Sequence, residues 1–234
     1  MATRSPPARL FRFVLWMLLL FVVSSVVLVV SLRWIDPPAS AFMIADRIDA
    51  MTGQSYPLRH RWTDWERIAT PMKVAVMASE DQSFPDHRGF DFKSIDKALE
   101  ERERGRVRGA STISQQVAKN LFLWSGRSWI RKGLEAYFTL LIEVCWPKQR
   151  ILEVYLNIAQ FGRGIYGVGA ASEAFFRKQP ARLNSYDAAL LAAVLPNPIR
   201  LKANAPSRYV RSRQEWIVTQ MRRLGGGAML KRLD

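Results

Sequence analysis

Cysteine and histidine are scarce in this chain, which contains one cysteine, Cys145, and two histidines, His60 and His87. A single cysteine cannot form a disulfide within the chain. Its apolar surroundings, LLIEVCW, indicate a packed thiol. Two histidines without an HExxH motif do not supply the usual ligands of a zinc site. The sequence therefore argues against a disulfide-stabilised fold and against a histidine-based zinc enzyme.

Acidic residues are also few, because 20 Asp and Glu stand against 35 Lys and Arg, which gives a formal net charge of +15. Such a charge attracts polyanions, namely nucleic acid, anionic lipid head groups or a phosphorylated substrate. A basic surface that serves only to keep the protein soluble would explain the same net charge. An apolar segment near the N-terminus, described next, is expected to export the main domain. We therefore expect the binding partner to be a lipid head group or a phosphate group, and not nucleic acid.

Charges are absent from residues 13–32, which arginines bracket on both sides. About 20 apolar residues at 1.5 Å per residue cross the roughly 30 Å hydrocarbon layer. A cleaved signal peptide is the alternative, but its apolar core is usually shorter. The preceding Arg4, Arg9 and Arg12 favour a cytoplasmic N-terminus. We therefore expect a cytoplasmic tail (1–12), a transmembrane anchor (13–32), a connector (33–60) and a main domain (61–228) outside the inner membrane.

Convincing strands and internal repeats are missing as well, and the apolar spacing beyond the connector is almost wholly helical. Thr70 and Pro71 read as an N-cap followed by proline at the first helical position. Further helices are predicted over residues 94–104, 109–124, 128–146, 148–161, 186–195 and 208–224. The sequence thus predicts one mainly α domain.

The predicted helix over residues 109–124 has two different faces. Thr112 and Gln115 fit a capping box, and Ile113, Val117 and Leu121 form an apolar stripe. The opposite face carries amides and one lysine: Gln115, Gln116, Lys119 and Asn120. This face is either an ordinary solvated surface or a hydrogen-bonding surface for a ligand.

Two further groups of charged residues each allow a structural and a functional interpretation from the local sequence. Glu80 and Asp81 precede His87 and form either a solvated turn or a catalytic carboxylate at the edge of a cleft. A second group contains Arg127, Arg131, Lys132 and Glu135. These residues form either helix salt bridges, worth about 0.3–0.5 kcal/mol each, or an anion site in which arginine supplies paired donors.

Two familiar motifs occur without the context that they require. Residues 94–97 match the SxxK motif of penicillin-binding transpeptidases, but no SxN or KTG partner follows and the chain is too short for that additional domain. Residues 162–167 match GxGxxG, but a helical pattern precedes them where a dinucleotide site needs a strand. We interpret these glycines as a turn that permits close helix packing.

Four segments occur in a characteristic order: SEDQSFPDHRGFD, GASTISQQVAKNLFL, RKGLEA and KQRILEVYLNIAQFG. Together they resemble the motifs of the peptidoglycan glycosyltransferases (glycosyltransferase family 51), closest to the monofunctional members that lack a transpeptidase domain. The resemblance covers residues 62–199, with small departures at Ala110 and Ser114. It implies a mainly α, lysozyme-like, two-lobed glycosyltransferase domain behind one N-terminal transmembrane helix. The implied reaction polymerises lipid II into β-1,4-linked glycan strands, with inversion and release of undecaprenyl diphosphate.

The resemblance also implies roles for individual residues. Glu80 would be the general base, and Glu135 would orient the donor or hold a metal on the diphosphate. Lys119 and Arg127 would bind the diphosphate with help from Arg131 and Lys132, while Gln115 and Gln116 would line the sugar site. Supporting positions are Asp81, Phe84, His87, Gly89, Ser111, Thr112, Asn120, Glu153 and Asn157.

Cofactors and partners follow from the same resemblance. Mg²⁺ or Mn²⁺ would neutralise the diphosphate, and no organic cofactor is expected. The expected partners are lipid II, the growing lipid-linked glycan chain, membrane lipids and other cell-wall synthesis or division proteins. The aromatic group formed by residues 121–124 and Trp129 either enters the membrane interface or packs in the core.

Two rival functions remain open from the sequence. A lysozyme-like lytic enzyme would share the fold and a catalytic glutamate, but it would need no cationic site for a diphosphate. A non-catalytic membrane scaffold of the cell-wall machinery would use the basic surface alone, and replacing Glu80 would leave its function unchanged.

Overall fold

The computed structural model describes residues 6–53, 56–94, 96, 100, 111–126 and 128–233. The chain divides into two compact units, Met1–Asp36 and Pro37–Asp234. The first unit contains helix α1, Pro6–Ser31, of which Arg9–Ser31 is long and apolar enough to cross a membrane. Hydroxyls within this helix donate to carbonyls one turn earlier, as from Ser24 to Phe21 and from Ser31 to Val27. Because these polar groups are satisfied internally, α1 fits a single-pass anchor.

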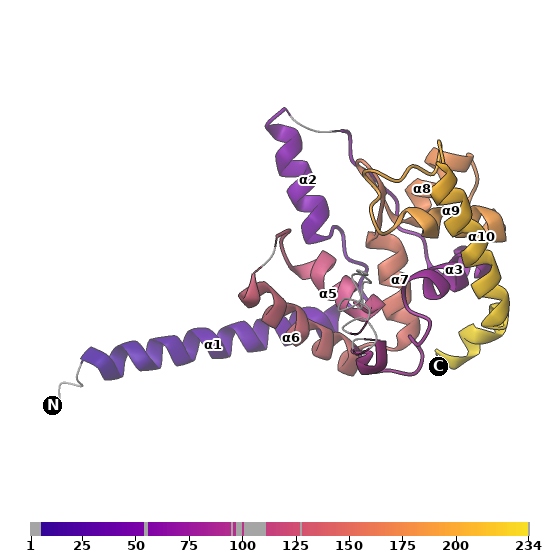
Figure 1. The fold of residues 1–234 in the computed structure, drawn as a ribbon. Coiled ribbons are helices and arrows are strands. Elements are labelled where there is room, and N and C mark those ends of the chain that lie inside the picture. Colours follow the sequence, from indigo (N-terminus) through magenta and orange to yellow (C-terminus); the bar gives the residue numbers. More distant parts are fainter. Residues whose placement is uncertain are drawn as a thin grey trace. The chain divides into compact units, whose positions relative to one another are not determined.

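The second unit is built mainly from helices (Figure 1), which confirms the predicted fold class. Its α-helices are α2 (Ala41–Met51), α3 (Thr70–Glu80), α5 (Ile113–Phe122), α6 (Trp129–Cys145), α7 (Lys148–Ile158), α8 (Gly167–Phe176), α9 (Ser185–Val194) and α10 (Arg208–Arg223). The described residues also form three 3₁₀ helices: η1 (Trp65–Arg67), η2 (Pro180–Arg182) and η3 (Gly226–Arg232). Most of the helix predicted over residues 94–104 lies outside the described residues.

Two helix starts can be compared with their predicted caps. Helix α5 has the expected capping box, in which Gln115 N–H donates to Thr112 Oγ1 at 3.2 Å and Thr112 N–H donates to Gln115 Oε1 at 3.0 Å. The predicted cap of α3 is wrong by one residue. Ala69 is the N-cap, and Thr70 and Pro71 occupy the first two helical positions, where a missing N–H costs no hydrogen bond.

The second unit contains two groups of packed helices. Helix α3 packs against α9, α10 and η3, and Figure 1 shows α10 running beside α9. Every residue of α3 from Met72 to Ala78 is buried. In the other group, α5 packs against α6 and α7, with Ile113 and Val117 fully buried, as the apolar stripe predicted. Because α3 is enclosed by its neighbours, the residue at its C-terminal end, Glu80, has a fixed backbone position.

A small sheet of three short strands lies beside α8 and was missed from the sequence. Strand β3 (Ile165–Tyr166) pairs parallel with β1 (Arg59–His60) and antiparallel with β2 (Gln160–Gly162). Helix α7 therefore ends at Ile158, and a strand follows it where a helix was expected to continue.

The glycines of the GxGxxG match nevertheless form a turn and permit close packing, as interpreted. Gly167 has a φ of +76°, and a Cβ there would lie 2.5 Å from the carbonyl oxygen of Asn157. A Cβ at the following Gly169 would lie 2.4 Å from the carbonyl oxygen of Arg61. These positions therefore require glycine because backbone from another segment passes against them.

Candidate active site

The loop after α3 is fixed by a buried hydrogen-bond network around Asp81. The Asp81 carboxylate accepts from His87 Nε2 at 2.9 Å and from the backbone N–H of Ile113 at 3.0 Å. His87 Nδ1 accepts from Gly89 N–H at 3.1 Å, so the proton of the neutral ring resides on Nε2. This network joins the end of α3 to the start of α5.

Phe84, Gly89 and Thr112 complete the same support. Phe84 is fully buried and meets the His87 ring edge to face at 6.0 Å between centroids. Thr112 Oγ1 donates to the Gly89 carbonyl at 2.7 Å. Gly89 has a φ of +88°, and a Cβ there would lie 2.8 Å from Thr139 Cγ2. The chain can therefore make this turn against α6 only with glycine.

Glu80 projects from the end of α3, and its side chain is only 12% exposed. Its Oε2 accepts from Gln116 Nε2 at 3.1 Å, and Gln116 Oε1 accepts from the Tyr155 hydroxyl at 3.2 Å. Within the described part of the chain, Glu80 Oε1 is buried and has no hydrogen-bond partner. The guanidinium of Arg213, on α10, lies 3.8 Å from this oxygen.

Burial raises the pKa of Glu80 above that of an ordinary glutamate. The hydrogen bond from Gln116 and the charge of Arg213 lower this pKa, the charge of Asp81 raises it, and the charge of Lys119 lowers it. A carboxylate whose pKa is raised toward the working pH is an effective proton acceptor. Glu80 therefore has the environment that a general base requires.

A group of cations surrounds Glu135, which is 3% exposed. Arg131 donates to one carboxylate oxygen at 2.8 Å, and Lys132 donates to the other. Burial lowers the pKa of Lys119, the charge of Glu135 raises it, those of Arg131 and Lys132 lower it, and that of Glu80 raises it. The charges of both carboxylates, Glu135 and Glu80, therefore act on Lys119. Arg127, the remaining predicted cation, lies outside the described residues.

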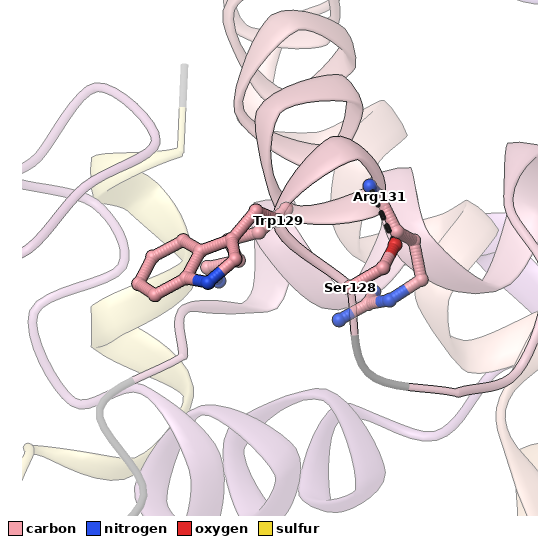
Figure 2. Close-up of a pocket in the computed structure, with 4 residues that line it drawn as sticks. Ser128, Trp129 and Arg131 are labelled. Atoms are coloured by element: carbon pink, nitrogen blue, oxygen red, sulfur yellow. Dashed lines mark hydrogen bonds between the residues drawn. The ribbon is translucent and has the colours of Figure 1, made fainter.

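Two cavities adjoin these groups. One, of about 290 Å³, is lined by Ser128, Trp129, Arg131 and Lys132. Figure 2 shows the Ser128 hydroxyl accepting from the Arg131 N–H at 3.1 Å, with the indole of Trp129 turned away from both. The other, of about 190 Å³, is lined by polar residues of α5 and by aromatic, apolar and amide residues of other segments: Gln116, Lys119, Asn120, Phe42, Tyr155, Ile158, Ala159, Gln160, Tyr166, Leu195, Pro196 and Pro198.

The two glutamines that the sequence placed at a sugar site differ in position. Gln116 lines the second cavity and holds Glu80. Gln115 is 5% exposed, and its carboxamide oxygen is engaged in the capping box of α5. Gln115 therefore fixes the start of the helix and does not line the cavity.

The remaining supporting residues lie in different surroundings. Ser111 is exposed, whereas Asn157 is fully buried. The Asn157 side chain accepts from Thr63 N–H at 2.8 Å and donates to the Thr63 carbonyl at 2.9 Å. Glu153 accepts from Trp65 N–H at 2.8 Å and from Arg150 at 2.7 Å. Glu153 and Asn157 therefore attach α7 to the segment before α3.

The predicted aromatic group divides into buried and exposed members. Leu121 and Leu123 are buried, and Phe122 stacks on Phe138 with 4.5 Å between ring centroids. Trp124 is 53% exposed and Trp129 is 93% exposed. Contact of these two tryptophans with a membrane interface stays a prediction.

Sequence reasoning missed Tyr155 and Arg213, which complete the surroundings of Glu80. Tyr155 lies within the helix predicted over residues 148–161, and Arg213 is one of many basic residues near the C-terminus. A helical pattern gives no signal that distinguishes either residue from its neighbours.

Comparison with known proteins identifies a family match and similar curated proteins. A family model described as transglycosylase matches residues 47–222. Three curated relatives bear the name biosynthetic peptidoglycan transglycosylase. The relative from Xanthomonas campestris pv. campestris is 53% identical over 232 residues, which cover 97% of this chain and 94% of the relative. That from Pseudomonas putida is 52% identical over 228 residues, covering 97% and 95%. That from Pseudomonas aeruginosa is 52% identical over 233 residues, covering 99% of each.

The family match begins within α2 and ends near the end of α10. It includes both carboxylates, the cation group and every lining residue of the second cavity except Phe42. The relatives are similar over nearly their whole length. The chain therefore belongs to the transglycosylase family and is a peptidoglycan glycosyltransferase.

Proposed function

We propose that the chain joins lipid II units into a β-1,4-linked glycan, with Glu80 as the general base. The observation that carries this proposal is the buried Oε1 of Glu80, which has no hydrogen-bond partner in the described residues and belongs to a carboxylate with a raised pKa. In the reaction, the O–H bond of the acceptor 4-hydroxyl breaks and its proton passes to Glu80. The acceptor oxygen bonds to the anomeric carbon of the donor while the bond to the diphosphate breaks, so the configuration inverts.

The leaving diphosphate needs positive charge as it separates. Lys119, Arg131 and Lys132 supply this charge beside the two cavities. In the free protein, Arg131 and Lys132 are paired with Glu135. We infer that Glu135 holds these two side chains in place and that they turn toward the diphosphate when the substrate binds.

A resident divalent cation does not fit this arrangement by itself. Both oxygens of Glu135 already accept from cationic side chains. The described residues also contain no group of three or more His, Cys, Asp or Glu side chains that could hold a metal. We propose that Mg²⁺ or Mn²⁺, where required, is carried by the diphosphate of the substrate, with Glu135 as one added ligand.

The position of the protein in the cell is also part of the proposal. The apolar helix α1 fits a single-pass anchor, and the arginines before it favour a cytoplasmic N-terminus. We propose that residues 37–234 act on the periplasmic side of the inner membrane, where they would meet membrane lipids and other cell-wall synthesis or division proteins. Accessibility of cysteines introduced at either end of α1 to a membrane-impermeant thiol reagent tests this orientation.

The two rival functions make different demands. A lytic enzyme would release fragments from finished cell walls and has no use for Lys119, Arg131 and Lys132 around a diphosphate. A scaffold would tolerate replacement of Glu80. Polymerisation of labelled lipid II by the purified protein, with the product digested by muramidase, distinguishes all three functions. Muramidase-sensitive polymer supports the transferase, and its absence from folded protein would contradict it.

A further inference from the structure

The two oxygens of the Glu80 carboxylate have different surroundings. Oε2 accepts a hydrogen bond from Gln116 Nε2 at 3.1 Å. Oε1 is buried, and no donor among the described residues bonds to it. A buried carboxylate oxygen without a partner is unfavourable and uncommon in folded proteins. Its presence at the end of a tightly packed helix indicates that the free oxygen has a function.

Tyr155 determines which way the Gln116 amide points. The Tyr155 hydroxyl donates to Gln116 Oε1 at 3.2 Å, so the amide nitrogen of Gln116 must face Glu80. Tyr155 is 1% exposed on α7, and burial raises the pKa of its hydroxyl well above 10. The hydroxyl therefore stays protonated and remains a donor at every pH at which the protein would be assayed.

Arg213 faces the other oxygen from α10. Its Nη2 lies 3.8 Å from Glu80 Oε1, which is too far for a hydrogen bond but close enough for strong attraction between charges. The Nε of Arg213 is itself buried without a hydrogen-bond partner in the described ranges. Arg213 can thus favour the ionised carboxylate without occupying the lone pairs of Oε1.

We propose that Tyr155 and Arg213 are positioning residues for the base: Tyr155 acts through Gln116 to hold Oε2, and Arg213 keeps the carboxylate ionised, so that Oε1 takes the proton. This inference rests on the proposed role of Glu80. The acceptor O–H bond breaks, the proton bonds to Oε1, and the electron pair of that bond forms the new glycosidic bond. The diphosphate leaves with the electron pair of the bond that breaks.

Other charged groups near Glu80 could also influence the ionisation of its carboxylate. Asp81 and Lys119 act on the carboxylate with opposite signs. The buried residues of α9, which packs against α3, are all apolar, from Ala188 to Val194. The basic residues of η3, Lys231 and Arg232, are exposed, and Arg232 pairs with Asp86. Within the ranges that the structure describes, Arg213 is therefore the cation outside α5 whose removal should change the ionisation of Glu80.

The test is the pH dependence of kcat for lipid II polymerisation by the full chain in detergent. Activity requires ionised Glu80, so it rises with pH through the pKa of that carboxyl. Arg213→Gln removes a charge that lowers this pKa, so the rising limb should move to higher pH with little change in KM. Arg213→Lys should keep the limb close to that of the wild type. Arg208→Gln, at an exposed position of the same helix, is the matched control for net charge and should not move it.

Tyr155→Phe keeps the ring and removes only the hydrogen bond to Gln116. Loss of one such bond should lower kcat about two- to tenfold and move the rising limb to higher pH, because the Gln116 amide is then free to turn. A purely structural role would lower the melting temperature and leave the shape of the profile unchanged. If Arg213→Gln does not fold, Tyr155→Phe, which retains the aromatic ring, carries the test.

Glu80→Gln, measured in parallel, separates the inference from the function on which it rests. Polymer from Glu80→Gln at the wild-type rate would overturn both. An inactive Glu80→Gln, together with wild-type pH profiles for Arg213→Gln and Tyr155→Phe, would overturn only the positioning roles. An inactive Glu80→Gln with shifted limbs in both variants supports the inference.

Discussion

The carboxylate of Asp81 accepts a hydrogen bond from the backbone N–H of Ile113 at 3.0 Å. This contact joins the residue after Glu80 to the first residue of α5, the helix that carries Gln116 and Lys119. The candidate base, Glu80, and the candidate diphosphate ligand, Lys119, are therefore held in fixed relative positions, although they come from different helices.

Asp81→Asn is expected to weaken this connection between α3 and α5. An asparagine would place its NH₂ group against one of two existing donors, His87 Nε2–H and the Ile113 N–H. Leaving one buried donor unpaired costs about 1–3 kcal/mol, which corresponds to a loss of several degrees in melting temperature for a domain of this size. Thermal unfolding followed by circular dichroism measures the loss.

Asp86→Asn is the matched control, because Asp86 lies in the same loop and its side chain is 55% exposed. Its ion pair with Arg232 is on the surface and is worth about 0–1 kcal/mol. Equal losses of stability in the two variants would contradict the structural role given to Asp81.

The raised pKa of Glu80 makes activity and stability depend on pH in opposite directions. Activity should rise as pH increases through this pKa, because the base must be ionised. Burial makes the pKa higher in the folded state than in the unfolded state. The stability contributed by the neutral carboxyl is therefore fully present at low pH and is lost as pH rises through the folded pKa.

Glu80→Gln should consequently be at least as stable as the wild type above that pKa, while it loses activity. Melting temperatures of both proteins, measured from pH 4 to pH 8, check this expectation. A Glu80→Gln variant that is less stable than the wild type at pH 8 by the same margin as at pH 4 would contradict the account.

Lys119→Met should reduce kcat/KM for lipid II by about ten- to a hundredfold. Lys119 lines the second cavity, and a hydrogen bond to a charged group is worth about 1.5–3 kcal/mol. Methionine is unbranched like lysine and only one atom shorter, so packing changes little. Lys202→Met, at an exposed position, should leave kcat/KM unchanged. Similar losses in both variants would indicate a general effect of net charge.

Metal removal tests the proposed carriage of Mg²⁺ or Mn²⁺ by the substrate. Chelation should lower the rate of polymerisation, and either ion should restore it. In Glu135→Gln, half-maximal activity should require more metal if the carboxylate is a ligand. If Glu135 acts only by holding Arg131 and Lys132, kcat should fall equally at every metal concentration. An unchanged rate in the presence of chelator would remove the metal from the proposal.

Local patterns in the sequence predicted much of the fold. The capping box of α5 depends on residues three positions apart, and the apolar stripe on residues four positions apart, so both could be inferred. Strands of two or three residues, such as β1 and β3, are too short to produce a recognisable alternation. Periodicity also placed Gln115 and Lys119 on one face, but the capping box draws the Gln115 side chain back toward Thr112.

The site was predictable only where its parts lie within motifs. Glu80, Glu135 and the cations could be named from the resemblance, whereas their hydrogen bonds could not. The bond from Gln116 to Glu80 joins positions 36 residues apart, and that from Tyr155 to Gln116 joins positions 39 apart. Such contacts depend on how helices pack, which single-sequence patterns do not encode.

The most direct test compares the wild type with Glu80→Gln in polymerisation of labelled lipid II with divalent metal, followed by muramidase digestion. The account predicts muramidase-sensitive glycan from the wild type and a loss of at least about 10²-fold in the variant, because the general base is absent. Equal polymer from both proteins would contradict the assignment of Glu80 and would move the search for the base to Glu135.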